Sequence, residues 1–119
     1  MESILTSIKK LIGFDKEYTH FDQDLIMLIN TTFATLRQIG IGPSDGFVIK
    51  DETATWSDYL GDTLLLETVK TYIHLKARLI FDPPSSSFVL EAIKESIKEY
   101  EWRLNVTAET RKEEIQNGT

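Results

Sequence analysis

The sequence contains no cysteine, so disulfide bonds and cysteine-ligated metal sites are excluded. This absence fits a reducing compartment. Long apolar runs are also missing, because the longest one, residues 25–29, falls far short of the roughly 20 residues that a membrane-spanning helix needs. Lys9 and Lys10 interrupt the apolar residues near the N-terminus, so we expect neither a secretion signal nor an association with a membrane.

Positive charge is scarce as well. The 119 residues include 13 Lys and Arg against 19 Asp and Glu, which gives a net charge of −6. This balance disfavours tight wrapping of nucleic acid, which depends on neutralising phosphates, although DNA that merely passes the protein is compatible with it. The length suits one domain that can bury a real core.

Two helix-forming stretches, joined by a hinge at residues 82–87, organise the sequence. Apolar residues cover more than half the circumference of a helix over residues 64–81, which predicts a central helix and the most buried element. Pro83 and Pro84 end this helix, and one of the three serines that follow can cap the next one. The second stretch, residues 88–104, carries a narrower apolar stripe, so the pair is expected to form an antiparallel hairpin.

Two further helices are expected before this hairpin. Residues 2–12 place their apolar residues on one side and Lys9 and Lys10 on the other, and so short a helix must dock on its own domain or on a partner. Residues 22–39 form a longer amphipathic helix, with Asp22 as its N-cap and Asn30 on its polar side.

A long loop occupies the middle of the chain. Residues 47–49 form either a short strand or an extended segment, and Thr55 with Asp58 resembles a capping box that opens a brief helical turn. After residue 104 apolar residues become rare, so the end of the chain is expected to fray or to be disordered. The predicted fold is therefore all-α: a small helical bundle with a long central helix and an antiparallel C-terminal hairpin. It comprises a single domain over residues 1–105 and a flexible polar tail over residues 106–119.

Candidate catalytic groups are few. The glycine-rich residues 40–46 match a turn better than a phosphate-binding loop, because a proline interrupts them and a helix precedes them. His20, Asp22 and Asp24 alternate, but the two aspartates suit the start of a helix better than a metal site. His74 has no cysteine or serine nearby as a nucleophile. We therefore expect no enzyme activity, no cofactor and no metal.

The candidate interface residues are apolar or charged side chains in unusual positions. Trp102 points away from the apolar stripe of its helix, and it either covers another element, such as the tail, or lies in an interface. Lys76 falls inside the apolar arc of the central helix, and it either extends its ammonium to water or forms a salt bridge across a subunit boundary. If the first helix docks on a partner, its apolar side contributes Ile4, Leu5 and Ile8.

Four stretches of the sequence carry a family resemblance: residues 24–43, 55–60, 69–88 and 101–105. The most distinctive are Phe-Asp-Pro-Pro-Ser at residues 81–85 and Glu-Trp-Arg-Leu at residues 101–104. Together they resemble the small head–tail connector (adaptor) proteins of long-tailed bacteriophages and prophages.

This resemblance implies a structural protein of the virion. Such proteins assemble as a ring, commonly of twelve copies, beneath the portal protein, extend the DNA channel, and dock the next connector or a tail protein. The implied location is the head–tail junction, with the host cytoplasm during assembly, and genome DNA passes without sequence-specific binding. The alternative is a small helical regulatory or partner-binding module for protein or nucleic acid, a role that a compact domain with an exposed Trp102 could fill.

Overall fold

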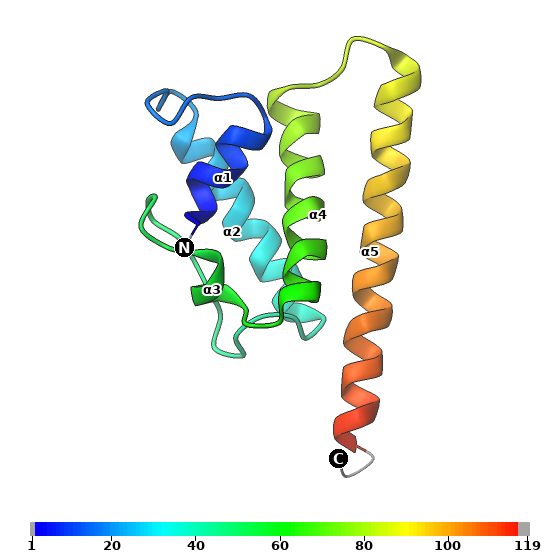
Figure 1. Ribbon diagram of the computed structural model, residues 1–119. Helices are drawn as coiled ribbons and strands as arrows, with labels where there is room; N and C mark the ends of the chain where they lie inside the picture. The colour runs from blue at the N-terminus through cyan, green and yellow to red at the C-terminus, as the bar shows by residue number, and fades with distance from the viewer. Residues whose placement is uncertain (1, 117–119) are drawn as a thin grey trace.

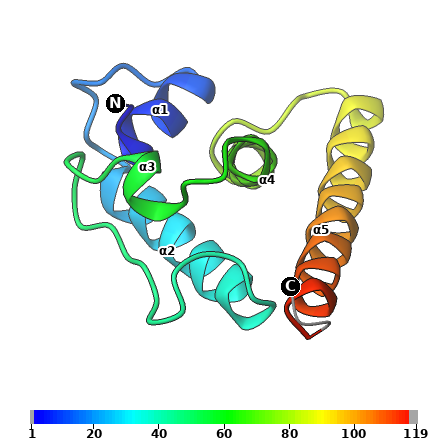
Figure 2. The ribbon, with the colours of Figure 1, turned by 60° about the horizontal axis from the view of Figure 1, so that its bottom comes forward.

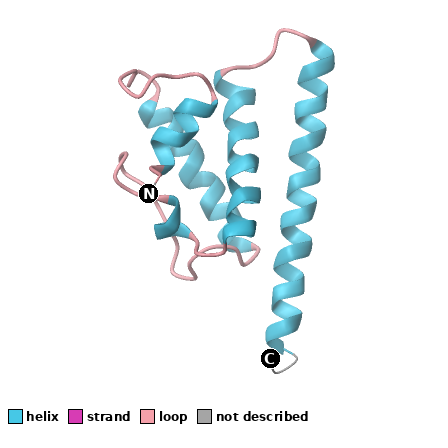
Figure 3. Cartoon of the chain, viewed as in Figure 1, coloured by secondary structure: helices cyan, strands magenta, loops and turns pink. Residues whose placement is uncertain are grey.

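The structure, a computed structural model, describes residues 2–116 apart from the side chains of residues 63, 113, 115 and 116. The described residues form five helices and no strand (Figures 1 and 3). They are α1 (Ile4–Leu11), α2 (Asp22–Gln38), α3 (Trp56–Tyr59), α4 (Thr63–Phe81) and α5 (Ser87–Gln116). The predicted all-α class is confirmed.

Helix α4 lies at the centre of the molecule. It contacts α1 and α2 on one side and α5 on the other, as the view along α4 in Figure 2 shows. Val69, Ile73 and Ala77 are fully buried on this helix, which confirms its central position.

The largest buried fraction, however, belongs to α1, where five of the eight residues are buried. Leu64 and Ile80, near the two ends of α4, are 86% and 60% exposed, because the neighbouring helices do not cover them. The prediction that residues 64–81 are the most buried element is therefore wrong.

The long middle loop is held against the core by a side chain of α2. The Asn30 amide donates to the Ile49 carbonyl at 3.0 Å, and its oxygen accepts from the Ile49 amide at 2.8 Å. Ile41 and Ile49 are both buried. Residues 47–49 are thus an extended segment rather than a strand, because Asn30 supplies the two hydrogen bonds that a neighbouring strand would have made. Asn30, expected on the polar side of its helix, is partly buried there by the loop that it binds.

The connection between α1 and α2 contains a buried ion pair. The Lys9 ammonium lies 2.9 Å from the Asp22 carboxylate and donates to the Lys16 carbonyl at 2.9 Å, and the Lys9 side chain is only 3% exposed. Asp22 is the first residue of α2, and its carboxylate faces Lys9 instead of capping the helix. The predicted N-cap role of Asp22 and the predicted outward position of Lys9 are both wrong.

The predicted capping box at the start of α3 is confirmed, and α4 also begins with a side-chain cap. The Thr55 amide donates to the Asp58 carboxylate at 2.9 Å in a capping box, and the Asp62 carboxylate accepts from the Leu65 amide at 3.1 Å. A further bond fastens α3 to α1, since the Trp56 indole donates to the Ser7 hydroxyl at 2.8 Å.

The hinge also forms as predicted. Helix α4 ends at Phe81, both prolines lie outside the helices, and the Ser86 hydroxyl accepts from the Val89 amide at 3.4 Å as α5 begins. The two helices form the expected antiparallel hairpin (Figure 1).

The predicted end of the last helix at residue 104 is wrong, because α5 continues to Gln116. Ala108 is 4% exposed, and the Arg111 guanidinium lies 3.8 Å from the Asp62 carboxylate. Residues 105–116 of α5 therefore contact the rest of the molecule. The division into a domain ending at residue 105 and a flexible tail stays a prediction, and residues 117–119 of that tail lie outside the described residues.

Candidate interaction surfaces

Among the side chains that the structure describes, no three His, Asp or Glu residues gather closely enough to hold a metal ion. His20 packs on Phe21, with ring centroids 4.6 Å apart, while Asp22 pairs with Lys9, so the alternating residues 20, 22 and 24 do not converge. Burial and the neighbouring charge of Arg78 lower the pKa of His74, which favours the neutral imidazole.

None of the described helices combines the length and the apolar character that crossing a membrane would require.

Helix α5 turns a distinct outer face away from α4. Its buried residues Ile93, Leu104 and Ala108 share one side, and the wheel places the outer face opposite them. We define this outer face of α5 by Phe88, Glu91, Glu95, Glu99, Trp102 and Val106.

The outer face combines carboxylates with large apolar side chains. Phe88, Trp102 and Val106 are 83%, 66% and 43% exposed. The carboxylates pair with bases of the same helix, as in the 2.9 Å contact between Glu99 and Arg103. Such exposed pairs contribute little to stability and leave the carboxylates accessible.

Trp102 does not cover residues 105–116, although covering the tail was one alternative that the sequence left open. Residues 105–116 continue α5 itself and run along its axis instead of folding back over the indole. Trp102 thus stands on a charged surface and exposes an apolar area that a partner could cover.

Lys76 is half-buried on α4. Its ammonium lies 5.1 Å from the centroid of the Tyr72 ring, a cation–π contact one turn away on the same helix. Among the described residues, no carboxylate forms an ion pair with it. The packing of its stem along α4 matches the simpler of the two interpretations, while a salt bridge to another subunit stays a prediction.

Ile4, Leu5 and Ile8 are buried in the chain's own core, at 0%, 2% and 0% exposure. They pack with residues of α2 and α4, since α1 contacts both helices. These three residues are therefore not a free surface, and the alternative in which the first helix docks within its own domain describes the structure.

A shallow apolar groove between α2 and the C-terminal end of α4 was not foreseen. This α2–α4 groove has a volume of about 410 Å³ and is lined by Asp24, Met27, Leu28, Thr31, Ile80 and Phe81. Met27 and Ile80 are 69% and 60% exposed. The sequence signal that could have indicated this groove is Met27, an apolar residue that lies off the buried stripe of its helix.

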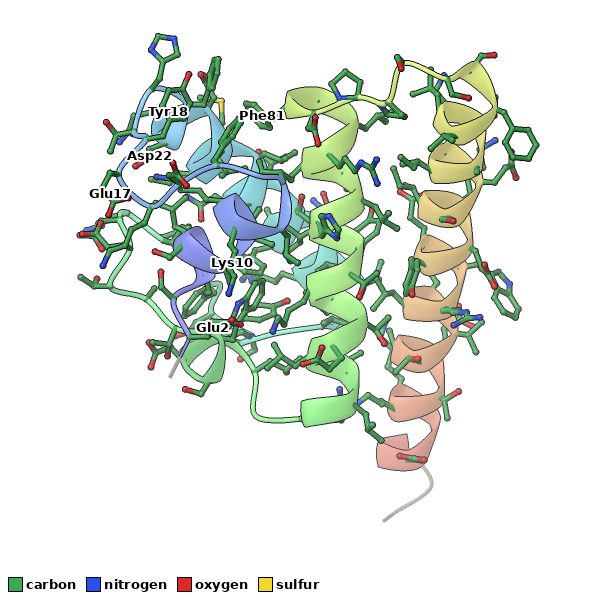
Figure 4. The ribbon with its side chains drawn as sticks, turned by 45° about the horizontal axis from the view of Figure 1, so that its top comes forward. Glu2, Lys10, Glu17, Tyr18, Asp22 and Phe81 are labelled. Carbon is green, nitrogen blue, oxygen red and sulfur yellow. The ribbon has the colours of Figure 1, made fainter. Side chains whose placement is uncertain are left out.

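Aromatic packing fixes one end of this groove. The Phe81 ring lies 5.8 Å from that of Phe21, and Phe21 packs in turn on Phe14 and Tyr18. Figure 4 shows Phe81 at the end of α4, beside the connection that carries Tyr18. The position of α4 relative to the start of α2, and with it the width of the groove, is therefore set by these rings.

A partly buried hydrogen bond connects α5 to α4. The Tyr72 hydroxyl donates to the Glu101 carboxylate at 2.8 Å, and burial together with that carboxylate raises the pKa of Tyr72. The bond borders a cavity of about 200 Å³ where α2, α4 and α5 meet. The orientation of the outer face of α5 is thus tied to the core.

Comparison with known proteins gives one finding. A family model described as phage connector protein matches residues 4–111. No curated protein and no solved structure matches the chain.

Proposed function

Since the chain belongs to the phage connector protein family, and is thus a structural connector of a phage virion, we propose that it forms a ring of twelve copies beneath the portal protein. The family match carries this proposal, because it spans nearly the whole chain, from residue 4 to residue 111. The ring extends the channel for DNA at the head–tail junction and docks the next connector or a tail protein. The copies that join it are made in the host cytoplasm.

Two features of the molecule support this proposal. The net charge of −6 disfavours tight contact with the phosphate backbone, so DNA can slide through the channel without sequence-specific binding. The exposed Trp102 and Lys76, with which no carboxylate among the described residues pairs, provide an apolar and a charged group for contacts with neighbouring copies.

The direct test is made on phage particles. Deleting the gene should leave DNA-filled heads without tails, and mass spectrometry of wild-type particles should count as many copies of this chain as of the portal protein. Particles that contain none of this chain, or that join heads to tails without it, would refute the proposal.

A second measurement tests the interface. Replacing Trp102 with Ala should lower the number of copies per particle at least about tenfold, since tryptophan is enriched among the residues that dominate binding energy. Leu64→Ala is the matched control, because it also removes an exposed apolar side chain, 86% exposed, from another part of the surface. Circular dichroism confirms that both variants fold. An unchanged copy number in Trp102→Ala would remove Trp102 from the interface.

A further inference from the structure

We infer that the α2–α4 groove of one copy receives the Trp102 side of α5 from a second copy. This inference rests on the proposed ring and names the two surfaces that make its subunit contact. Both surfaces belong to this chain, and both leave large apolar side chains in water.

The apolar parts of the two surfaces fit each other in kind. Trp102 projects from α5 and is 66% exposed, while Met27 and Ile80 line the shallow α2–α4 groove and are 69% and 60% exposed. A flexible methionine adapts to the shape of a bound ring and makes favourable contacts with it. Inserting Trp102 would remove all three side chains from water at once.

The charges around these side chains are also complementary. Asp24 lines one wall of the groove, and Lys76 lies one turn from Ile80 on the same side of α4. On α5, Lys98 and Glu99 flank Trp102 on its two sides, and Lys98 is 72% exposed. Lys98 and Glu99 already pair with Glu95 and Arg103 of the same helix. Among the described residues no carboxylate pairs with Lys76, so Lys76 is the charge beside the groove that a carboxylate of a second copy can pair with.

The spacing along the helices allows an ion pair to form beside the indole. At a rise of about 1.5 Å per residue, Lys76 lies about 6 Å from Ile80 along α4, and Glu99 lies about 4.5 Å from Trp102 along α5. Lys76 of one copy can thus meet Glu99 of the other when the indole of Trp102 lies beside Ile80.

The two surfaces lie on different sides of the molecule. The outer face of α5 lies opposite the residues that pack on α4, so it cannot reach the groove of its own chain. When the groove of one copy binds α5 of a second copy, the first copy still has its own α5 free and the second copy its own groove. Further copies can therefore add in the same way, and the series closes into a ring when the rotation between copies allows it.

Cysteine cross-linking tests the contact directly, because the chain has no native cysteine. Thr31→Cys places a thiol in the groove, and Val106→Cys places one a turn away from Trp102. Particles are produced with both substitutions in one chain and treated with a short bismaleimide. We expect a ladder of dimers, trimers and larger products.

The matched control moves the first thiol out of the groove. Glu67→Cys lies on the opposite side of α4, with the Glu67 side chain 69% exposed, and combined with Val106→Cys it should give no ladder. Particles that contain the doubly substituted chain but yield no ladder, or an equal ladder in the control, would overturn this inference and leave the proposed function intact. Particles that lack even the wild-type chain would instead refute the proposed function.

A charge exchange provides a second readout. Lys76→Glu places two carboxylates opposite each other when Glu99 is the partner, so the cross-linked yield should fall at least about tenfold. Adding Glu99→Lys in the same chain restores opposite charges and should restore the yield. If the yield stays low in the doubly exchanged chain while circular dichroism shows a folded protein, Lys76 and Glu99 do not meet.

Discussion

At the scale of single residues, Tyr59 carries a buried hydroxyl without a partner. No acceptor among the described residues lies within hydrogen-bonding reach of its oxygen. The ring stacks on Phe33 at 4.1 Å, and Gly42, with a φ of +93°, lies so close that a Cβ there would be 2.8 Å from the ring. Burial raises the pKa of Tyr59 to about 12. The ring therefore stabilises the core while its hydroxyl weakens it.

Replacing Tyr59 with Phe should leave the free energy of unfolding unchanged or raise it by about 1 kcal/mol, because the unpaired hydroxyl disappears. In the wild type, the unfolded chain ionises this tyrosine near pH 10 and the folded chain only near pH 12. The free energy of unfolding is therefore unaffected by this group below pH 10, and it falls as the pH rises from 10 through 12, because only the unfolded chain ionises there. Urea unfolding should show that the free energy of unfolding falls less between pH 10 and pH 12 in Tyr59→Phe than in the wild type.

Tyr18→Phe is the control for this experiment, because Tyr18 is 44% exposed and should change stability little at any pH. A loss of more than about 1 kcal/mol in Tyr59→Phe would show that the hydroxyl has a partner in solution.

The ion pair between Lys9 and Asp22 gives a second prediction at this scale. Asp22→Ala should lower the free energy of unfolding by about 2–3 kcal/mol, because it leaves the buried Lys9 ammonium without its counter-charge. The Asp22 side chain is 22% exposed, which lets water offset part of the loss.

Asp24→Ala separates this effect from the helix dipole, since both aspartates lie in the first turn of α2. It should cost no more than about 0.5–1 kcal/mol, the typical contribution of one charge at that position. Equal losses in the two variants would mean that the ion pair adds nothing beyond the dipole.

At the scale of secondary-structure elements, α4 offers two isoleucines in opposite environments. Ile73 is fully buried and Ile80 is 60% exposed. Ile73→Ala should destabilise the protein by about 2–5 kcal/mol, because it leaves a cavity in the core. Ile80→Ala should change stability by no more than about 0.5 kcal/mol. Urea unfolding measures both, and a loss below about 0.5 kcal/mol for Ile73→Ala would contradict its place in the core.

Residues 105–116 are helical in the structure but were expected from the sequence to be flexible, and the two can be told apart by experiment. The structure has residues 105–116 in a helix with Ala108 buried, whereas the sequence predicts a flexible tail. Hydrogen exchange should therefore be slow at the amides of residues 106–110, compared with an exposed loop residue such as Val48, which is 64% exposed. Exchange at random-coil rates in residues 106–110 would support the flexible tail.

At the scale of the whole molecule, one long helix dominates the shape. The described molecule measures 48 × 35 × 20 Å, and the 30 residues of α5 span about 45 Å at the usual helical rise. One side of this helix packs on α4, and the opposite side is free for most of its length (Figure 1). The large free surface suits a protein that makes contacts with neighbouring copies.

The charge of the molecule leads to a prediction about DNA. At low salt, a band-shift assay with duplex DNA should show no complex up to about 10 µM protein, a concentration at which many nonspecific DNA-binding proteins already bind. The physical reason is the net charge of −6, which leaves few cations free to neutralise phosphates. A basic DNA-binding protein serves as the positive control. A complex that weakens steeply with added salt would show that a local basic surface overrides the net charge.

The sequence by itself determined the elements whose causes are local. Proline in the hinge ends a helix wherever the chain goes next, and the side chains of Asp62 and Ser86 cap the helices that follow them within three residues. The apolar periodicity gave the central helix and the hairpin, and the exposed position of Trp102 followed from the same wheel.

Only the tertiary structure decided which surfaces meet. Lys9 became buried because Asp22 and the Lys16 carbonyl surround its ammonium, and Asn30 turned inward because a loop segment 19 residues away needed both its donor and its acceptor. The α2–α4 groove likewise depends on how α2 and α4 cross. Helical period reports which residues share a face, but pairing between distant segments depends on packing, which no local pattern encodes.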